Sequence, residues 1–324
     1  MVSDDARASA EASFVETLCL PVLRRSQNED GGWGFHPNSE SRVEATCWAS
    51  LALASTASPE TSRDPVAKSL EFLLAAQLPD GSWPASPEER TGCWVTSLAC
   101  WALLCKKDSR ETATAVKNGL DWLCKDWPRT STLLQRFLRR ISSARRISKQ
   151  SEFYSGWGWT PRTGSWVEPT SCALLLLSLA PAELLPPSAM RRRELAEAML
   201  YDRMCPGGGW NSGNPMVYGV AGESLATPTV WALLALRNYA NRIENIQSLD
   251  WLEQNLLCIQ GPGSFALARL CFGTYGRQWP AELPSLGKFY EQNEFLESIP
   301  VIAWTCLAAN SHCSWLEPAQ RARA

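Results

Sequence analysis

SLEFLLAAQLPDGSW (69–83) decides the fold of this chain, because it joins an amphipathic helix to a glycine turn that ends in tryptophan. Apolar residues recur at helical spacing in its first half, and Asp-Gly favours a turn with positive φ. Trp33 and Trp83, like Trp159 and Trp210, are about 50 residues apart, a period typical of stacked or closed helical arrays. The turns that share this pattern are QNEDGGWGF (27–35), SGWGW (155–159), PGGGW (206–210) and a degraded QGPGSF (260–265). The chain is therefore predicted to be a repeat protein in which these turn tryptophans are structural.

Each repeat adds a second helix that is almost wholly apolar. Such a helix must be buried on every side, whereas the amphipathic helices, for example 65–77 and 248–260, bury one face. The apolar helices are expected at 43–55, 92–104, 167–180, 226–240, 264–276 and 298–310. Wrapped by about as many amphipathic helices, they predict an all-α fold, a closed (α/α)6 toroid of about twelve helices that forms one domain over 1–324. The alternative, an open array, would need a polar terminal cap, and none is obvious.

The composition narrows the functional classes. The 324 residues carry a net charge of −2, which disfavours a general nucleic-acid binder. There are 16 Trp but only two His, and the 12 Cys form no CxxC pair, so neither a metal site nor a cofactor is predicted. The N-terminus lacks the regions of a signal peptide, and no apolar run reaches the ~18 residues that span a bilayer. A cytoplasmic location is therefore expected.

One segment interrupts the repeat at 128–154. Its apolar positions between Leu133 and Ile141 form a stripe flanked by five arginines, within 133–147. A basic amphipathic helix of this kind can lie on an anionic membrane, which would make the protein membrane-peripheral. The alternative, which we favour, is a helical insertion that packs its stripe on the toroid and solvates its arginines.

The Q-x-x-D-G-x-W turns at 27–35 and 69–83 resemble the QW repeats of squalene and oxidosqualene cyclases. The wider helix–turn–helix pattern over 20–310 is similar to that superfamily and to protein prenyltransferase β subunits. The resemblance implies the toroid fold and points to a class II, protonation-initiated terpene cyclase acting on a polyprenyl substrate. The prenyltransferase branch is disfavoured because those enzymes need a zinc site, and His36 and His312 are poorly placed to build one.

Two apolar helices begin with a shared signature, SRVEAT (41–46) and SWVEPT (165–170). By resemblance to the DxDD-T-A pattern of class II cyclases, Glu44 and Glu168 fall at the position of the proton-donating Asp. Protonation of an alkene or epoxide needs a neutral carboxylic acid, which burial favours, and the carbocations that follow are stabilised by aromatic faces. We expect a substrate-binding lining of tryptophans on or beside the inner helices: Trp48, Trp94, Trp101, Trp166, Trp231 and Trp304.

Two alternatives stay open at this point. Ser41 with Glu44, and Ser165 with Glu168, also fit the capping box, in which the glutamate is ionised and structural. The chain also lacks a DxDD motif, which favours a non-catalytic isoprenoid- or lipid-binding toroid. The substrate's chain length and head group, the ring pattern of a product and the oligomeric state are not predicted.

Overall fold

A computed structural model describes residues 4–55, 59–105, 109–125, 154–310 and 316. The basic segment 133–147, and with it the prediction of membrane contact, lies outside these residues. Within the described part of the chain, no helix is both long and apolar enough to cross a membrane.

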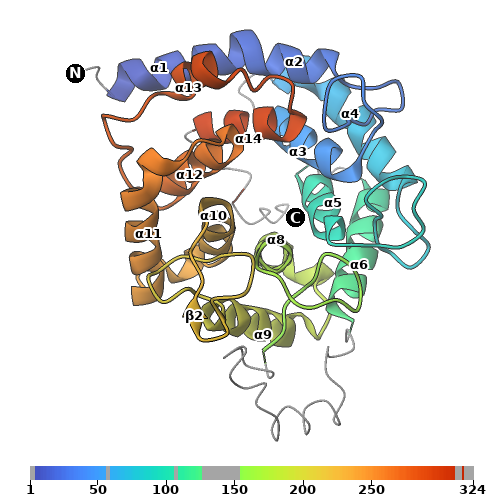
Figure 1. The fold of residues 1–324 in the computed structure, drawn as a ribbon. Helices are drawn as coiled ribbons and strands as arrows, with labels where there is room; N and C mark the ends of the chain where they lie inside the picture. Colours follow the sequence, from blue (N-terminus) through green and yellow to red (C-terminus); the bar gives the residue numbers. More distant parts are fainter. Residues whose placement is uncertain (1–3, 56–58, 106–108, 126–153, 311–315, 317–324) are drawn as a thin grey trace, which may run out of the picture.

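Within the described residues, six apolar helices form a closed inner ring (Figure 1). Each contacts the next in chain order, and the last packs against the first, which closes the circle. This arrangement confirms the predicted all-α toroid. The inner helices are α3 (Val43–Ala54), α5 (Val95–Leu104), α8 (Val167–Leu179), α10 (Ala226–Ala235), α12 (Pro262–Thr274) and α14 (Ile299–Ala309).

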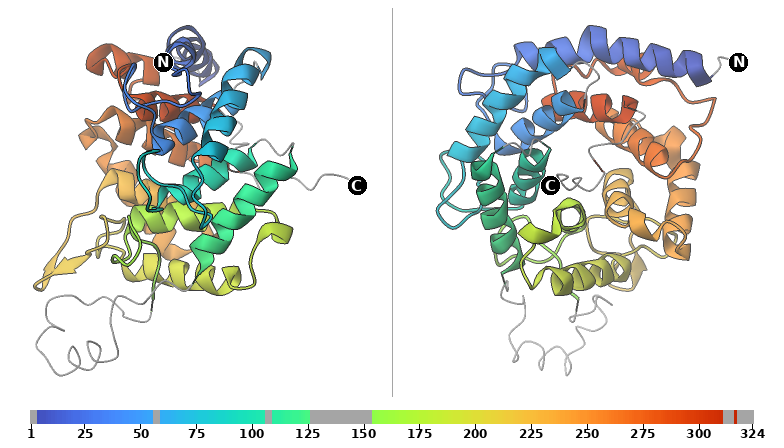
Figure 2. Two further views of the ribbon diagram at one scale, coloured as in Figure 1. Left: turned by 90° about the vertical axis from the view of Figure 1, so that its right-hand side faces the viewer. Right: turned by 180° about the vertical axis from the view of Figure 1, so that it is seen from behind.

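The outer ring wraps these helices with one amphipathic segment per repeat. Its first segment is the run α1 (Asp4–Phe14), η1 (Val15–Cys19, a π-helical stretch) and α2 (Leu20–Arg25). The others are α4 (Pro59–Ala75), α6 (Arg110–Cys124), α9 (Ala189–Asp202), α11 (Ile243–Asn255) and α13 (Leu286–Asn293). Short 3-10 turns are η3 (Ala182–Leu184), η4 (Arg237–Tyr239) and η5 (Leu256–Cys258). A small antiparallel hairpin, β1 (Met216–Val217) with β2 (Val220–Ala221), projects from the ring (Figure 2).

The turn tryptophan joins an outer helix to an inner helix in four of the described repeats. Its indole N–H donates to a leucine carbonyl of the preceding outer segment, and its backbone N–H donates to a threonine hydroxyl on the following inner helix. The indole bonds are Trp33 to Leu23 (2.7 Å), Trp83 to Leu73 (2.6 Å), Trp157 to Leu123 (2.9 Å) and Trp210 to Leu200 (2.6 Å). The hydroxyl acceptors are Thr46, Thr96, Thr170 and Thr229, each at 2.9 Å.

The prediction that Trp159 is the third turn tryptophan is wrong, because Trp157 makes both of these bonds. Trp157 is buried, whereas Trp159 is 36% exposed and packs edge-to-face on Trp94 at 5.1 Å between ring centroids. Trp159 therefore does not make the two hydrogen bonds that join the helices in the other repeats.

This difference predicts that Trp157→Phe lowers the free energy of unfolding by about 1–3 kcal/mol, because the buried carbonyl of Leu123 loses its donor. Trp159→Phe keeps an aromatic ring against Trp94 and is expected to cost less than about 0.5 kcal/mol. Urea unfolding of the two variants checks the assignment, and equal losses would contradict it.

The ring closes through a backbone hydrogen bond and a side-chain contact between its ends. The Ile299 N–H donates to the Phe35 carbonyl at 2.9 Å, and His36 Nδ1 lies 2.8 Å from the Glu297 carbonyl oxygen. His36 is thus a seam residue that joins the first and last repeats.

Candidate active site

The capping-box interpretation of the two SxxE signatures is wrong. α3 begins after Arg42 and α8 after Trp166, and neither N-cap residue makes a side-chain capping bond. The hydroxyl of Ser41 donates to Asp30 at 2.8 Å, and that of Ser165 accepts from the Gly156 N–H at 3.0 Å. Both serines therefore stabilise the glycine turns, and neither occupies the N-cap position that a capping box requires.

The repeat places four residues at one level of the inner ring. Each lies two positions before one of the four threonines that accept the backbone N–H of a turn tryptophan. They are Glu44, Trp94, Glu168 and Thr227. All four are half-buried, while the residues that follow them in their helices are buried. Because α3, α5 and α8 are consecutive in the ring, Trp94 belongs to the repeat between those of the two glutamates. We call this level, at the N-terminal ends of the inner helices, the mouth of the ring.

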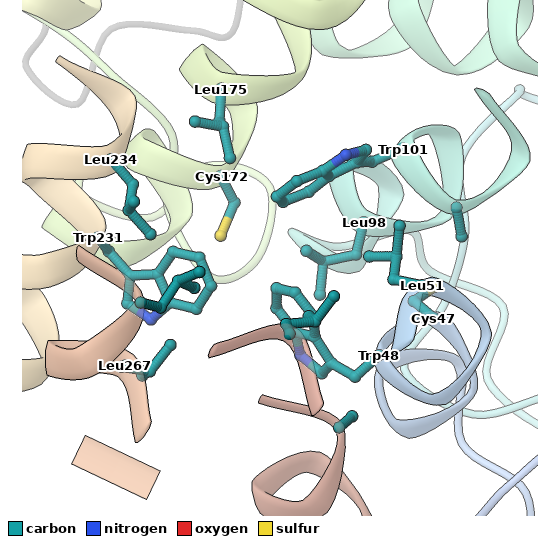
Figure 3. Packing of buried hydrophobic residues seen from close by; sticks show 14 of the residues in the cluster. Cys47, Trp48, Leu51, Leu98, Trp101, Cys172, Leu175, Trp231, Leu234 and Leu267 are labelled. Atoms are coloured by element: carbon teal, nitrogen blue, oxygen red, sulfur yellow. The ribbon is translucent and has the colours of Figure 1, made fainter. Parts of the chain in front are cut away.

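Both carboxylates face the inside of the ring. Side chains four residues apart on a helix share a face, and Glu44 precedes Trp48 as Glu168 precedes Cys172. Trp48 and Cys172 point toward the centre (Figure 3). Burial raises the pKa of the Cys172 thiol, and the charge of Glu44 raises it further, although α5 lies between their helices in the ring.

Glu44 has the environment of a neutral acid. Burial raises its pKa from 4.5 to about 7, and the indole of Trp48 opposes part of this rise. No cation among the described residues contributes to its pKa. The Trp48 indole N–H is buried and makes no hydrogen bond of good geometry, so it stabilises the carboxylate only weakly. A carboxyl group that is half protonated near neutral pH can donate a proton there.

Glu168 has a more polar environment. Its Oε1 accepts from the Ser212 hydroxyl at 3.1 Å, and Oε2 is buried without a hydrogen-bond partner. Burial raises the pKa of Glu168, and its own backbone N–H and Ser212 lower it. Ser212 also accepts the Val167 N–H through its carbonyl at 3.1 Å, which fixes the loop against the start of α8.

The six tryptophans predicted to bind substrate fall into two groups. Trp48 contacts Trp101, Trp231 and Trp304, with ring centroids 6.0, 5.3 and 5.8 Å away. These four come from four inner helices, and each lies within its helix rather than at its start, so we call them the tryptophan floor. Figure 3 shows Trp48, Trp101 and Trp231 pointing toward the middle of the ring. Trp94 and Trp166 lie at the mouth, where both are half-buried.

Ser212 and Thr227 are mouth residues that the sequence analysis missed. Thr227 shares a hydrogen bond with Ser264 (2.8 Å between the hydroxyl oxygens), which joins α10 to α12. Thr227 could have been found from its position two residues before Thr229. Ser212 follows Trp210 in a loop of irregular length, and no sequence pattern marks it.

The described residues contain no group of three or more His, Cys, Asp or Glu side chains arranged to hold a metal ion. The mouth brings together two carboxyl groups, two tryptophans and the hydroxyl groups of Ser212 and Thr227.

The raised pKa of Glu44 predicts a fold that loses stability as the pH rises. Below pH 4.5 the carboxyl is protonated in both states, and between pH 4.5 and 7 only the unfolded chain ionises, so the stability falls. The full loss, at most about 3 kcal/mol, is reached above pH 7. Glu44→Gln cannot ionise and is expected to exceed the parent in unfolding free energy at pH 8 but to match it at pH 4.

Urea unfolding at both pH values measures this difference. Glu40→Gln is the control, because Glu40 is exposed and only forms a surface pair with Arg42. A gain from Glu44→Gln that is the same at pH 4 and pH 8 would contradict the raised pKa.

Comparison with known proteins supports this class of fold. No family model matches the chain. It is 28% identical to a drimenyl diphosphate synthase of Streptomyces showdoensis over 252 residues, which cover 68% of this chain and 46% of that protein. It is 34% identical to a lanosterol synthase of Aspergillus fumigatus over 71 residues, 19% of this chain and 9% of that protein. These relatives confirm the resemblance to the squalene and oxidosqualene cyclase superfamily. The chain spans less than half the length of either relative.

Solved structures confirm the fold alone. The type II terpene cyclase MstE from Scytonema aligns over 94% of this chain and 99% of its own, with a TM-score of 0.52 and 13% identity. An α-amylase from Clostridium perfringens aligns over 92% of this chain and 98% of its own, with a TM-score of 0.62 and 10% identity. Since one toroid carries such different activities, the site residues must decide the function.

Proposed function

We propose that this chain is a class II terpene cyclase-like enzyme that protonates an isoprenoid polyene at the mouth of its ring, with Glu44 as the acid. The observation that carries the proposal is the Glu44 carboxyl, which faces the ring interior with its pKa raised to about 7 by burial. A surface or capping glutamate would remain ionised and could not begin this reaction.

The other residues at the mouth fit the steps after protonation. Protonation of a terminal alkene leaves a tertiary carbocation, and ring closure moves that charge along the chain. Trp94, next to Glu44 in the ring, presents an aromatic surface at the same level, and each cation–π contact can contribute about 0.5–2 kcal/mol. The tryptophan floor below offers the hydrocarbon tail an apolar surface without a nucleophile. The relatives named for drimenyl diphosphate and lanosterol support an isoprenoid as the ligand class.

Incubation with isoprenoid probes in D₂O tests the proposal. Farnesyl diphosphate, geranylgeranyl diphosphate and squalene are supplied separately, and products are identified by mass spectrometry. Initiation by an exchangeable carboxyl group predicts a cyclised isomer in which one hydrogen is replaced by deuterium, so that it is one mass unit heavier than the substrate. Absence of any cyclised product from all three probes would overturn the proposal.

The second candidate is a non-catalytic toroid that binds an isoprenoid or lipid. Two observations favour it: the chain has no DxDD motif, and the contact between Trp48 and Trp231 closes the ring axis. Binding of the same probes without any product, measured by quenching of tryptophan fluorescence, would support this candidate over the enzyme.

A further inference from the structure

The two carboxylates at the mouth have different partners, and this difference assigns them different tasks. Among the described residues, the indole of Trp48 is the one donor that affects Glu44, whereas Glu168 accepts a hydroxyl hydrogen bond from Ser212 and is further stabilised by its own backbone N–H. A carboxyl group with few hydrogen-bond donors keeps its proton, whereas one that accepts more hydrogen bonds ionises more readily. Glu44 suits proton donation, and Glu168 suits proton acceptance.

We propose that Glu168, held by Ser212, is the base that ends the reaction by taking a proton from the cyclised carbocation. This inference rests on the proposed function and adds a second catalytic residue to it. The sequence does not indicate which glutamate is the acid and which the base, because Glu44 and Glu168 occupy equivalent positions in their repeats.

The geometry at Glu168 supports a proton acceptor. Only one of its two carboxylate oxygens is hydrogen-bonded, and the second is a buried acceptor without a donor. A buried acceptor left unfilled costs free energy, so a purely structural carboxylate would be expected to have its partners. No cation among the described residues contributes to its pKa, so Glu168 is not half of an ion pair.

Ser212 keeps this carboxylate in one position. Its carbonyl accepts the Val167 N–H and its hydroxyl donates to Glu168, so one residue fixes both the first turn of α8 and the side chain that follows. Ser212 itself is a positioning residue, since it acts through Glu168.

The reaction balances without an oxidant or a cofactor. The Glu44 O–H adds its proton to a terminal alkene carbon, and the alkene electrons of the chain form the new C–C bonds. A C–H bond beside the final carbocation then breaks, its electron pair forms a C=C bond, and the proton goes to a Glu168 carboxylate oxygen. The product is an isomer of the substrate. Exchange with water restores both carboxyl groups, since both side chains are half-buried rather than sealed.

The test compares product distributions in D₂O for the parent and the Glu168→Gln variant, with the three isoprenoid probes. Glu168→Gln is expected to lower the share of the parent's main alkene about tenfold or more, in favour of other alkene isomers or alcohols formed by water capture. Its products should still carry the deuterium that Glu44 supplies. Ser212→Ala is expected to shift the distribution in the same direction but less, and Glu223→Gln, an exposed change on the same loop, is expected to leave it unchanged.

Three outcomes would overturn the inference in distinguishable ways. An unchanged product from Glu168→Gln removes Glu168 from the termination step and leaves the proposed function standing. Loss of all turnover in a folded Glu168→Gln variant makes Glu168 the acid instead. No cyclised product from the parent protein overturns the proposed function and this inference together. If Glu168→Gln does not fold, Ser212→Ala carries the same comparison, because it keeps the carboxylate.

Discussion

Glu44→Gln is expected to lower the rate of isoprenoid cyclisation by about 10²–10⁴-fold, the usual contribution of a general acid. Glutamine has the size of the protonated glutamic acid but cannot release a proton to an alkene. The substitution adds no charge to a site that burial already disfavours for charge, so the fold is expected to remain intact. Product formation per minute, measured by gas chromatography of extracted reactions, gives the rate.

The pH profile of the parent protein gives an independent check on the same acid. Because the pKa of Glu44 is about 7, the rate is expected to fall tenfold for each unit of pH well above 7, as the protonated fraction decreases. Glu40→Gln, an exposed change four residues earlier, is the control and should keep both the rate and the profile. A Glu44→Gln variant that cyclises at the parent's rate would remove Glu44 from the reaction.

The architecture could be predicted from the sequence because burial on every side leaves a clear pattern. The predicted apolar helix at 43–55 differs from the observed α3 by one residue. All residues of α3 except Glu44 and Ala54 are buried, which is why its sequence is almost wholly apolar. The prediction at 226–240 is too long, because α10 ends at Ala235 and the chain continues into a separate 3-10 turn. Apolar composition alone does not distinguish these two conformations.

The tryptophan assignment could have been made from spacing rather than from the glycine pattern. Trp33, Trp83 and Trp157 each lie 13 residues before the threonine that accepts their backbone N–H. Trp159 does not have this spacing. In the fourth repeat the spacing is 19 residues, because the intervening loop contains the β1–β2 hairpin.

The chemistry of the two glutamates could not be predicted, because it depends on contacts between repeats. The sequence places Ser41 correctly for a capping box, but Asp30 in the adjacent turn accepts its hydroxyl hydrogen. Ser212 reaches Glu168 from 44 residues away in the chain. The different environments of Glu44 and Glu168 therefore arise from tertiary structure, although their local sequences are alike.

Trp48→Ala is expected to lower the free energy of unfolding by about 3–5 kcal/mol, the usual range for removal of a buried large aromatic side chain. Trp48 is 1% exposed and contacts three other tryptophans across the ring. Each aromatic contact contributes about 0.5–1.5 kcal/mol beyond the burial of its area. The substitution thus leaves a cavity where four inner helices meet, and neighbouring rings cannot fill it without breaking their own contacts.

Trp94→Ala is the matched control for this effect. Trp94 is half-buried at the mouth, and its ring contacts that of Trp159. Trp94→Ala is therefore expected to lower the free energy of unfolding by about 1–2 kcal/mol less than Trp48→Ala does. Urea unfolding at pH 7, with the denaturant slope compared between variants, separates a loss of stability from a change in the unfolded state. Equal losses from the two substitutions would mean that the Trp48 contacts do not hold the ring together. In that case the outer turns, with their buried indole bonds to Leu73 and Leu200, would be the main source of its stability.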